Sequence, residues 1–274
     1  MLKDMLKNVR EQAPLIHNIT NYVTVNDCAN ILLALGASPI MSDDKEEVEE
    51  ITSICSGLNI NIGTLNQNTI PSMFLAGKRA NELSHPVILD PVGVGASKLR
   101  TDTAKELLKN INFTAVKGNI SEIKTLAIGK GTTKGVDADI SDKVDETNLN
   151  EVIDFLEDFS REIEAIVIVT GQIDIVTDGK KSYIIRNGHS VMSSITGTGC
   201  MLSAITCAYL AANKDNMLEA CLASVCTMGY AGQMAYKKMK ETGGGNASFR
   251  NYLIDCIFNL NSTELEKGAK YECR

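Results

Sequence analysis

Residues 165–171 read Ala-Ile-Val-Ile-Val-Thr-Gly, a run that stays apolar up to Thr170. Apolar side chains at successive positions cover both faces of a strand. That pattern is typical of a parallel strand buried by helices on both sides. We therefore predict that residues 165–170 form a central strand of a parallel sheet.

Shorter runs of the same kind precede this segment, and helix-length amphipathic segments separate them. The predicted strands cover residues 37–41, 58–63, 86–90 and 114–117. The predicted helices cover residues 23–35, 45–56, 69–83, 102–110 and 122–128. Alternation of this kind predicts βαβ units, with helices packed on both faces of a mostly parallel sheet.

The pattern changes after Gly171. Residues 174–177 and 182–186 are rich in β-branched side chains, and Asp178-Gly179 lies between them. Asp-Gly between two such runs is a strong hairpin signal, so we expect an antiparallel hairpin at the edge of the parallel sheet. Beyond Gly199 the sequence predicts helices over residues 200–212, 217–240 and 248–260.

The whole chain, residues 1–274, is expected to form a single α/β domain. No internal repeat is visible, and no linker is long or biased enough to divide the sequence. The polar stretch 129–147 is predicted to be a surface excursion, and residues 264–274 to be a frayed end.

The charge and hydropathy of the chain argue against several classes of function. The chain has 27 Lys and Arg against 34 Asp and Glu, a net charge of −7, which argues against binding nucleic acid or an anionic membrane. Residues 200–212 form the longest mainly apolar stretch, which is too short to span a bilayer. Since the charged N-terminus also lacks the apolar core of a secretory signal, we expect a cytoplasmic protein.

Cysteine usage agrees with a reducing compartment. The eight cysteines form no Cys-x-x-Cys pair, and the three histidines are scattered along the chain. We therefore expect free thiols rather than disulfides, and no structural zinc site.

Ligands of open parallel sheets bind beyond the carboxyl ends of the strands. Polar or glycine-rich clusters follow the predicted strands and the hairpin at these positions, which should form one rim: residues 41–44, 90–96, 117–122, 170–171 and 196–200.

The sharpest of these clusters is Thr196-Gly197-Thr198-Gly199-Cys200, which ends where a predicted helix begins. Two glycines permit close approach of a ligand, and the amides at a helix start suit a phosphate. The alternative is an ordinary glycine-rich loop before a buried helix. The third glycine of a dinucleotide-binding motif is missing, and no P-loop sequence occurs.

Cys200 is the main candidate for chemistry. In the first turn of the predicted helix, the positive end of the helix dipole favours its thiolate form. It could act as a base that accepts a proton from a substrate hydroxyl, or as a covalent nucleophile. The alternative is a small, buried, apolar cysteine, which is the interpretation we give to Cys207, Cys221 and Cys226.

Two carboxylates and one lysine complete the rim. Asp90 and Glu122 could hold Mg²⁺, which takes one or two carboxylates together with phosphates. Lys117 could neutralise the charge of a transferred phosphate, or could be a solvated lysine at a strand end. Asn119 and Glu122 also have the spacing of a helix capping box, which by itself would explain Glu122.

A polar cluster, residues 17–21, precedes the first predicted helix. Together with Met41, which ends the strand after that helix, it could line a pocket for a small and partly apolar ligand. Met41 could equally be a core residue.

The ordered motifs of the chain resemble the hydroxyethylthiazole kinase family, a branch of the ribokinase-like superfamily. The similarity covers nearly the whole chain, and the cysteine after Gly-Thr-Gly separates it from most ribokinase-like enzymes, which are expected to carry Asp there. The motifs are residues 14–21 with Ala29-Asn30, 37–41, 90–96, 117–122, 169–171, 197–200 and 248–250.

The resemblance implies a ribokinase-like three-layer α/β/α fold and transfer of the ATP γ-phosphoryl group to the alcohol of 4-methyl-5-(2-hydroxyethyl)thiazole in thiamine salvage. It also implies Mg²⁺ and a homotrimer with active sites at the subunit interfaces. The implied roles are thiazole contact for Met41 and Gly197, ATP contact for Lys117 and Thr170, metal binding for Asp90 and Glu122, and the base for Cys200. The family more usually has Arg at the position of Lys117, and Lys lacks the planar fork of Arg.

Three other functions stay open at this point. Another kinase of the superfamily would act on a pyrimidine alcohol or a sugar. A non-catalytic sensor of nucleotide or thiazole would need neither metal-binding carboxylates nor a base. A redox switch would draw on the eight thiols, which lie mostly in segments predicted to be buried helices.

Overall fold

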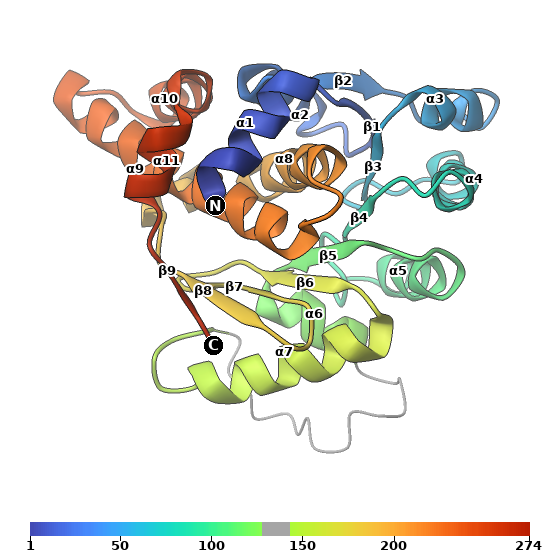
Figure 1. The fold of residues 1–274 in the computed structure, drawn as a ribbon. Helices are drawn as coiled ribbons and strands as arrows, with labels where there is room; N and C mark the ends of the chain where they lie inside the picture. The colour runs from blue at the N-terminus through green and yellow to red at the C-terminus, as the bar shows by residue number, and fades with distance from the viewer. Residues whose placement is uncertain (128–142) are drawn as a thin grey trace.

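In the computed structural model, which describes residues 1–127 and 143–274, nine strands form one sheet (Figure 1). Its strand order is β2-β1-β3-β4-β5-β6-β7-β8-β9. The strands are β1 (Leu15–Ile19), β2 (Ser38–Met41), β3 (Gly57–Asn61), β4 (Val87–Asp90), β5 (Ala115–Gly118), β6 (Ile166–Val169), β7 (Asp174–Thr177), β8 (Ser182–Ile185) and β9 (Tyr271–Cys273).

The sheet is parallel from β2 through β6 and antiparallel from β6 through β9. The parallel sheet and the hairpin of β7 and β8 confirm the predicted fold class. Parallel register brings the carboxyl ends of β2 to β6 to one edge, because each strand starts at the same side of the sheet. The polar clusters that follow these strands therefore share that edge, as predicted.

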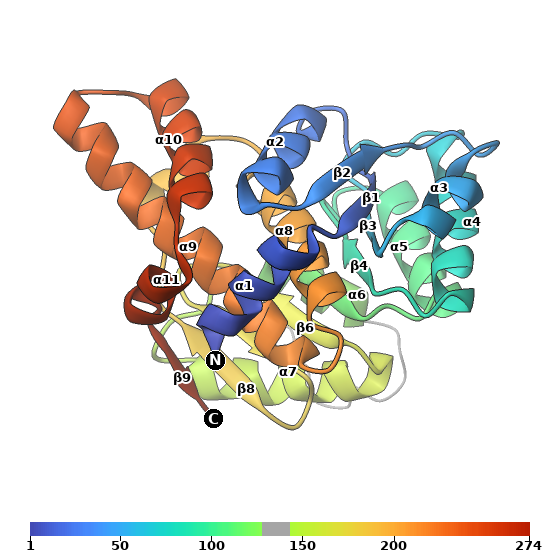
Figure 2. The same cartoon turned by 45° about the horizontal axis from the view of Figure 1, so that its top comes forward.

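Helices cover both faces of the sheet and make two apolar cores (Figures 1 and 2). One face, here called the α8 face, carries α1 (Leu2–Gln12), α2 (Val25–Leu35), α8 (Thr198–Ala212), α9 (Met217–Thr242), α10 (Asn246–Asn259) and α11 (Ser262–Gly268). The opposite face carries α3 (Val48–Ile54), α4 (Thr69–Glu82), α5 (Lys98–Asn110), α6 (Ile120–Ala127) and α7 (Leu149–Ile163). A short 3-10 helix, η1 (Ser190–Ser194), precedes α8.

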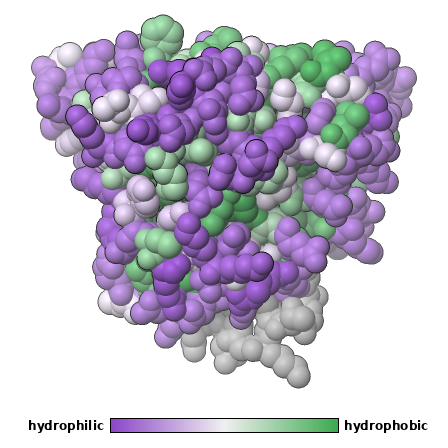
Figure 3. All heavy atoms as spheres, in the orientation of Figure 1, coloured by the Kyte–Doolittle hydropathy of each residue, from purple (hydrophilic) through white to green (hydrophobic). Residues whose placement is uncertain are grey.

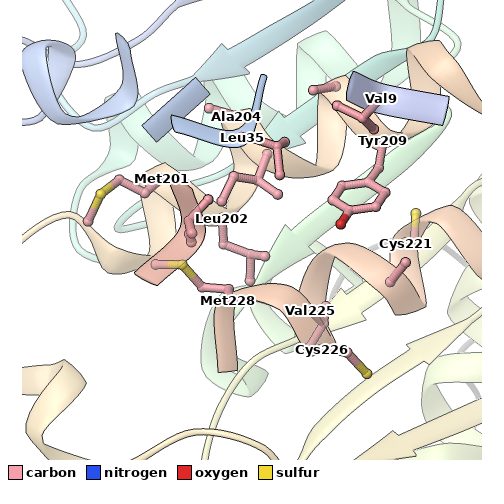
Figure 4. Packing of buried hydrophobic residues seen from close by; sticks show 14 of the residues in the cluster. Val9, Leu35, Met201, Leu202, Ala204, Tyr209, Cys221, Val225, Cys226 and Met228 are labelled. Carbon is pink, nitrogen blue, oxygen red and sulfur yellow. The ribbon is translucent and has the colours of Figure 1, made fainter. Parts of the chain in front are cut away.

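Helix α8 is the buried centre of its face. Every residue from Cys200 to Ala212 is buried, between the sheet and the helices α1, α2 and α9. Figure 4 shows Leu202 and Tyr209 of α8 packed among side chains from these neighbours. A helix that is apolar on most sides is stable only when other elements enclose it. The buried hydroxyl of Tyr209 is hydrogen-bonded to Thr227 Oγ1 of α9 at 2.7 Å. Hydrophilic residues cover most of the face visible in Figure 3, and hydrophobic residues form smaller groups along its upper edge and near its centre.

Several elements were not predicted. They are α1, β1, α7, α11 and β9. The expectation of a frayed end at 264–274 is wrong, because β9 pairs with β8 and the backbones of Ser182 and Arg274 exchange two hydrogen bonds at 2.8 and 3.1 Å. Most of the predicted surface excursion 129–147, namely residues 129–142, lies outside the described residues. Over the described ranges, no helix combines the length and the hydropathy needed to cross a bilayer.

Candidate active site

Three polar residues lie at or next to the carboxyl ends of the central strands, on the α8 face. Asn61, Asp90 and Lys117 are each buried, on β3, β4 and β5 respectively. Side chains alternate along a strand, and the residues next to these three pack into the core of the opposite face. The three polar groups therefore point toward the first turns of α8.

Lys117 and Asp90 form a buried ion pair. Lys117 Nζ lies 3.2 Å from Asp90 Oδ1, and the two side chains are only 5% and 1% exposed. The same ammonium donates to the Gly199 carbonyl at 3.0 Å. Burial opposes its charge, but the carboxylates of Asp90 and Glu122 help to hold the pKa of Lys117 above its ordinary value. The alternative of a solvated lysine is thus wrong.

The second oxygen of Asp90 is fixed from two sides. Oδ2 accepts hydrogen bonds from Asn61 Nδ2 at 2.8 Å and from Ser203 Oγ at 2.7 Å. Oδ1 is buried without a hydrogen-bond partner in the described part of the chain and has only the charge of Lys117 beside it. Oδ2 therefore orients the carboxylate through two hydrogen bonds, while Oδ1 faces the Lys117 ammonium.

The start of α8 lies against the start of α2. Gly197, the residue before α8, has φ +89°, and a Cβ there would lie 2.7 Å from Thr24 Cγ2 at the start of α2. Only glycine fits this left-handed, crowded position. No side chain of the described residues caps α8, so its first amides stay available to a ligand.

Cys200 lies in the first turn of α8 and is 8% exposed. Its sulfur accepts hydrogen bonds from Asn21 Nδ2 at 3.2 Å and from Asn61 Nδ2 at 3.3 Å. The cysteines interpreted as core residues differ from it. Cys207, Cys221 and Cys226 are fully buried, and burial raises the pKa of each thiol far above its ordinary value.

Glu122 caps α6 and also fastens the loop after β4. Its Oε2 accepts from the Asn119 amide at 2.9 Å, and Asn119 Oδ1 accepts from the Glu122 amide at 2.8 Å. The predicted capping box is confirmed. In addition, Glu122 Oε1 accepts from the Gly93 amide at 2.8 Å, which ties the loop that follows Asp90 to this carboxylate.

A cavity of about 820 Å³ opens beside the start of α8, and one of about 530 Å³ adjoins it. Thr170 and Gly171 line both, while Thr198 and Gly199 line the larger one. This size suits a nucleotide. Asp174 also lines the larger cavity and accepts from the Gly171 amide at 2.9 Å, while burial raises its pKa to about 7.

Most of the predicted site residues do not line these cavities. Within the described chain, Thr170 is the one predicted site residue in their walls, and Met41, Asp90, Lys117, Glu122, Gly197 and Cys200 are not. Met41 ends the edge strand β2 opposite Asn18 in register, and Gly197 lies on the α2 side of the α8 start. The larger cavity therefore reaches the first turn of α8 at Thr198 and Gly199, while Cys200 of the same turn lies outside the wall of that cavity.

Sequence reasoning did not single out Asn61 and Ser203, and it treated Asn21 only as part of a polar cluster. The available signal was the alternation of apolar and asparagine residues in the predicted strand 58–63, which places Asn61 on the face opposite to Ile60 and Ile62.

The comparisons with known proteins agree with one another. The model of the hydroxyethylthiazole kinase family matches residues 6–263. A hydroxyethylthiazole kinase of Clostridium acetobutylicum is 63% identical, with 99% of each chain covered, and one of Clostridium tetani is 52% identical, with 97% of this chain and 96% of the relative covered.

Solved structures extend this similarity to the fold. A hydroxyethylthiazole kinase protein from Pyrococcus horikoshii OT3 superposes with a TM-score of 0.86 at 38% identity, over 100% of this chain and 98% of that one. A pyridoxal kinase from Staphylococcus aureus, with a TM-score of 0.57 at 17% identity over 80% of this chain and 87% of that one, shares the fold alone.

Proposed function

Because the chain belongs to the hydroxyethylthiazole kinase family, we propose that its active site is the start of α8, with Cys200 as the base. The protein is a kinase that transfers the γ-phosphoryl group of ATP to the hydroxyl of 4-methyl-5-(2-hydroxyethyl)thiazole, a thiamine-related reaction. The observation that supports the site is the convergence of Cys200, the Lys117–Asp90 pair and the nucleotide-sized cavity on one helix turn.

ATP would lie in the larger cavity with its phosphates toward α8. Thr170 at the end of β6 and the amides around Gly199 line the path to that helix start. Phosphoryl transfer needs positioning and charge neutralisation more than covalent chemistry. The uncapped amides of α8 and the Lys117 ammonium supply positive charge where the phosphoryl group would pass.

The thiazole alcohol would approach from the side of Gly197 and Met41. Cys200 Sγ would accept the hydroxyl proton as the hydroxyl oxygen bonds to the γ-phosphorus. The bond from that phosphorus to the β,γ-bridging oxygen breaks, and ADP leaves with the electron pair. The proton stays on the sulfur until it passes to water, so the thiol is not consumed.

Magnesium fits the two carboxylates near this path. Asp90 Oδ1 is buried without a hydrogen-bond donor, and each Glu122 oxygen accepts only one backbone amide in the described structure. Two carboxylates with phosphate oxygens are a typical set for Mg²⁺. Asp90 and Glu122 would hold the ion, which, when bound, neutralises phosphate charge.

A homotrimer would complete the thiazole side. β2 is an edge strand whose residues are all partly exposed, and the neighbouring Tyr22 and Val23 are 77% and 57% exposed. Large apolar side chains beside an active site favour burial by another subunit. The chain would act as one domain, residues 1–274. The free thiols of its cysteines support a reducing, cytoplasmic location.

An ADP-release assay tests this function. We expect release that depends on both Mg²⁺ and the thiazole alcohol, and none with 4-methyl-5-ethylthiazole, which lacks the hydroxyl. A pyrimidine alcohol and a sugar alcohol serve as competing acceptors. Faster turnover of either one than of the thiazole alcohol would contradict the substrate assignment.

A further inference from the structure

Two asparagine amides hold the Cys200 sulfur. Asn21 comes from the turn before α2 and Asn61 from the end of β3, and both direct Nδ2 at the sulfur, at 3.2 and 3.3 Å. Both partners of the sulfur in the described chain are thus donors. Two N–H groups directed at one sulfur stabilise a thiolate more than a thiol, because hydrogen bonds to an ionised acceptor are stronger than those to a neutral one.

The orientation of both amides is fixed by backbone groups. Asn21 Oδ1 accepts from the Thr24 amide at 3.1 Å, and Asn61 Oδ1 accepts from the Gly63 amide at 2.9 Å. Backbone N–H groups can only donate, so the oxygen of each side chain must face them. The NH₂ groups must therefore point toward the sulfur, and a flip of either amide would break at least one backbone bond.

Asn61 also links the Cys200 sulfur to the carboxylate of Asp90, the residue proposed to bind Mg²⁺. Its NH₂ group donates to Asp90 Oδ2 at 2.8 Å as well as to Cys200 Sγ, and its Oδ1 accepts from Asn21 Nδ2 at 3.0 Å. One rigid amide thus sets the separation of two groups on different elements, β4 and α8. Asn61 is 1% exposed, which leaves it little freedom to reorient.

We propose that Asn61, aided by Asn21, is a positioning residue that holds the Cys200 sulfur in its thiolate form and at a fixed place relative to Asp90. The inference rests on the proposed role of Cys200 as the base. Two N–H donors supply the stabilisation that burial removes from an anion. They also prevent the sulfur from turning away from an incoming hydroxyl, as proton transfer requires.

The test measures the ultraviolet absorbance of the Cys200 thiolate as a function of pH. The signal is the difference between each protein and the same protein with Cys200→Ser, which cancels the other seven thiols. We expect Asn61→Ala and Asn21→Ala to move the midpoint of this signal upward by about one pH unit. An unchanged midpoint in both variants would overturn the proposal.

Asn59→Ala is the matched control. Asn59 is a buried asparagine on the same strand and face, but its Nδ2 donates to Asn18 Oδ1 at 3.0 Å rather than to Cys200 or Asp90. Its midpoint should equal that of the unmodified protein. A shift as large as that of Asn61→Ala would mean that any loss of a buried amide perturbs the sulfur, and would contradict a specific role. If Asn61→Ala does not fold, Asn21→Ala and Asn61→Ser carry the same test.

Turnover separates this inference from the function on which it rests. With the thiazole alcohol, Asn61→Ala should lower kcat about 10- to 100-fold with a smaller change in KM, and the loss should shrink in a Cys200→Ser background. If the unmodified protein did not phosphorylate the alcohol, the proposed function would fail while the midpoints still decided the positioning role. Turnover with unshifted midpoints would remove the positioning role alone.

Discussion

Successive residues of strands β3 to β5 point to opposite faces of the sheet, and the two faces differ in chemistry. On the α8 face the strands end in Asn61, Asp90 and Lys117, while their neighbours Ile60 and Leu89 on the other face are fully buried in an apolar core. Helices cover both faces. Among the described residues of these three strands, buried charged side chains occur on the α8 face alone.

This difference shows which face of the sheet lowers the free energy of unfolding relative to apolar packing, namely the α8 face. Burying an ion pair is costly relative to apolar packing, so the pair of Lys117 and Asp90 is poorly explained by stability. The opposite face demonstrates that the same strands can be packed with apolar side chains alone. We therefore expect the polar groups to serve the proposed reaction, so substitutions on the two faces should separate activity from stability.

Asp90→Asn should have the largest effect. It leaves the Lys117 ammonium buried without its counter-charge and removes the oxygen proposed to bind Mg²⁺. We expect kcat/KM for the thiazole alcohol to fall about 100- to 1,000-fold. Unfolding in urea should show a loss of about 3–5 kcal/mol.

Asp154→Asn is the control for this change. Its ion pair with Arg274 has nearly the same length, 3.0 Å, but the side chains are 66% and 41% exposed. It should alter stability by less than about 1 kcal/mol and leave turnover intact. Equal losses in the two variants would show that burial of the Asp90 pair carries no functional meaning.

Leu89→Ala tests the apolar face, one residue from Asp90. Truncating this fully buried leucine should lower the free energy of unfolding by about 2–5 kcal/mol. At a temperature where the variant stays folded, its kcat should match that of the unmodified protein. A fall in kcat comparable to that of Asp90→Asn would break the separation between the two faces.

Asp174→Asn has the smallest expected effect and sharpens the role of charge on the α8 face. Burial raises the pKa of Asp174 to about 7, above the unfolded value of about 3.9, so the folded state keeps a proton that the unfolded state loses. The unmodified protein should therefore lose stability as the pH rises from about 4 to about 7. The asparagine variant, which cannot titrate, should gain about 1–2 kcal/mol relative to it over that window.

Urea unfolding of both proteins at pH 4 and pH 8 measures this difference. The carboxylate is partly exposed at the cavity wall, so solvent reduces the effect below that of a fully buried group. A stability difference that is the same at both pH values would contradict the raised pKa.

The sequence alone predicted the elements that have a clear local pattern, such as an uninterrupted apolar run or an Asp-Gly turn. The apolar runs that became β4, β5 and β6 and the Asp-Gly hairpin were predicted to within about two residues. β1 was missed because His17 and Asn18 give it the polarity of a loop, although both side chains are buried and hydrogen-bonded. β9 was missed because three residues carry no pattern and their pairing with β8 joins segments about 90 positions apart.

The site was predicted only in part, for a similar reason. Asp90, Lys117 and Cys200 have local signals, namely a strand end or a helix start behind glycines. The contacts of Asn21 and Asn61 with Cys200 span 179 and 139 positions, and no local pattern specifies such contacts. The structure brings Asp90, Lys117 and Cys200 close together, but the roles predicted for all seven site residues remain predictions: Met41, Asp90, Lys117, Glu122, Thr170, Gly197 and Cys200.

The most direct test of the central claim, that Cys200 is the base for phosphoryl transfer, is kcat/KM from ADP release with the thiazole alcohol, measured for three proteins at one pH. We expect Cys200→Ser, whose hydroxyl does not ionise usefully, to lower kcat/KM about 100-fold, and Cys200→Asp to retain or raise it. Equal values for the unmodified protein and Cys200→Ser would contradict the base role.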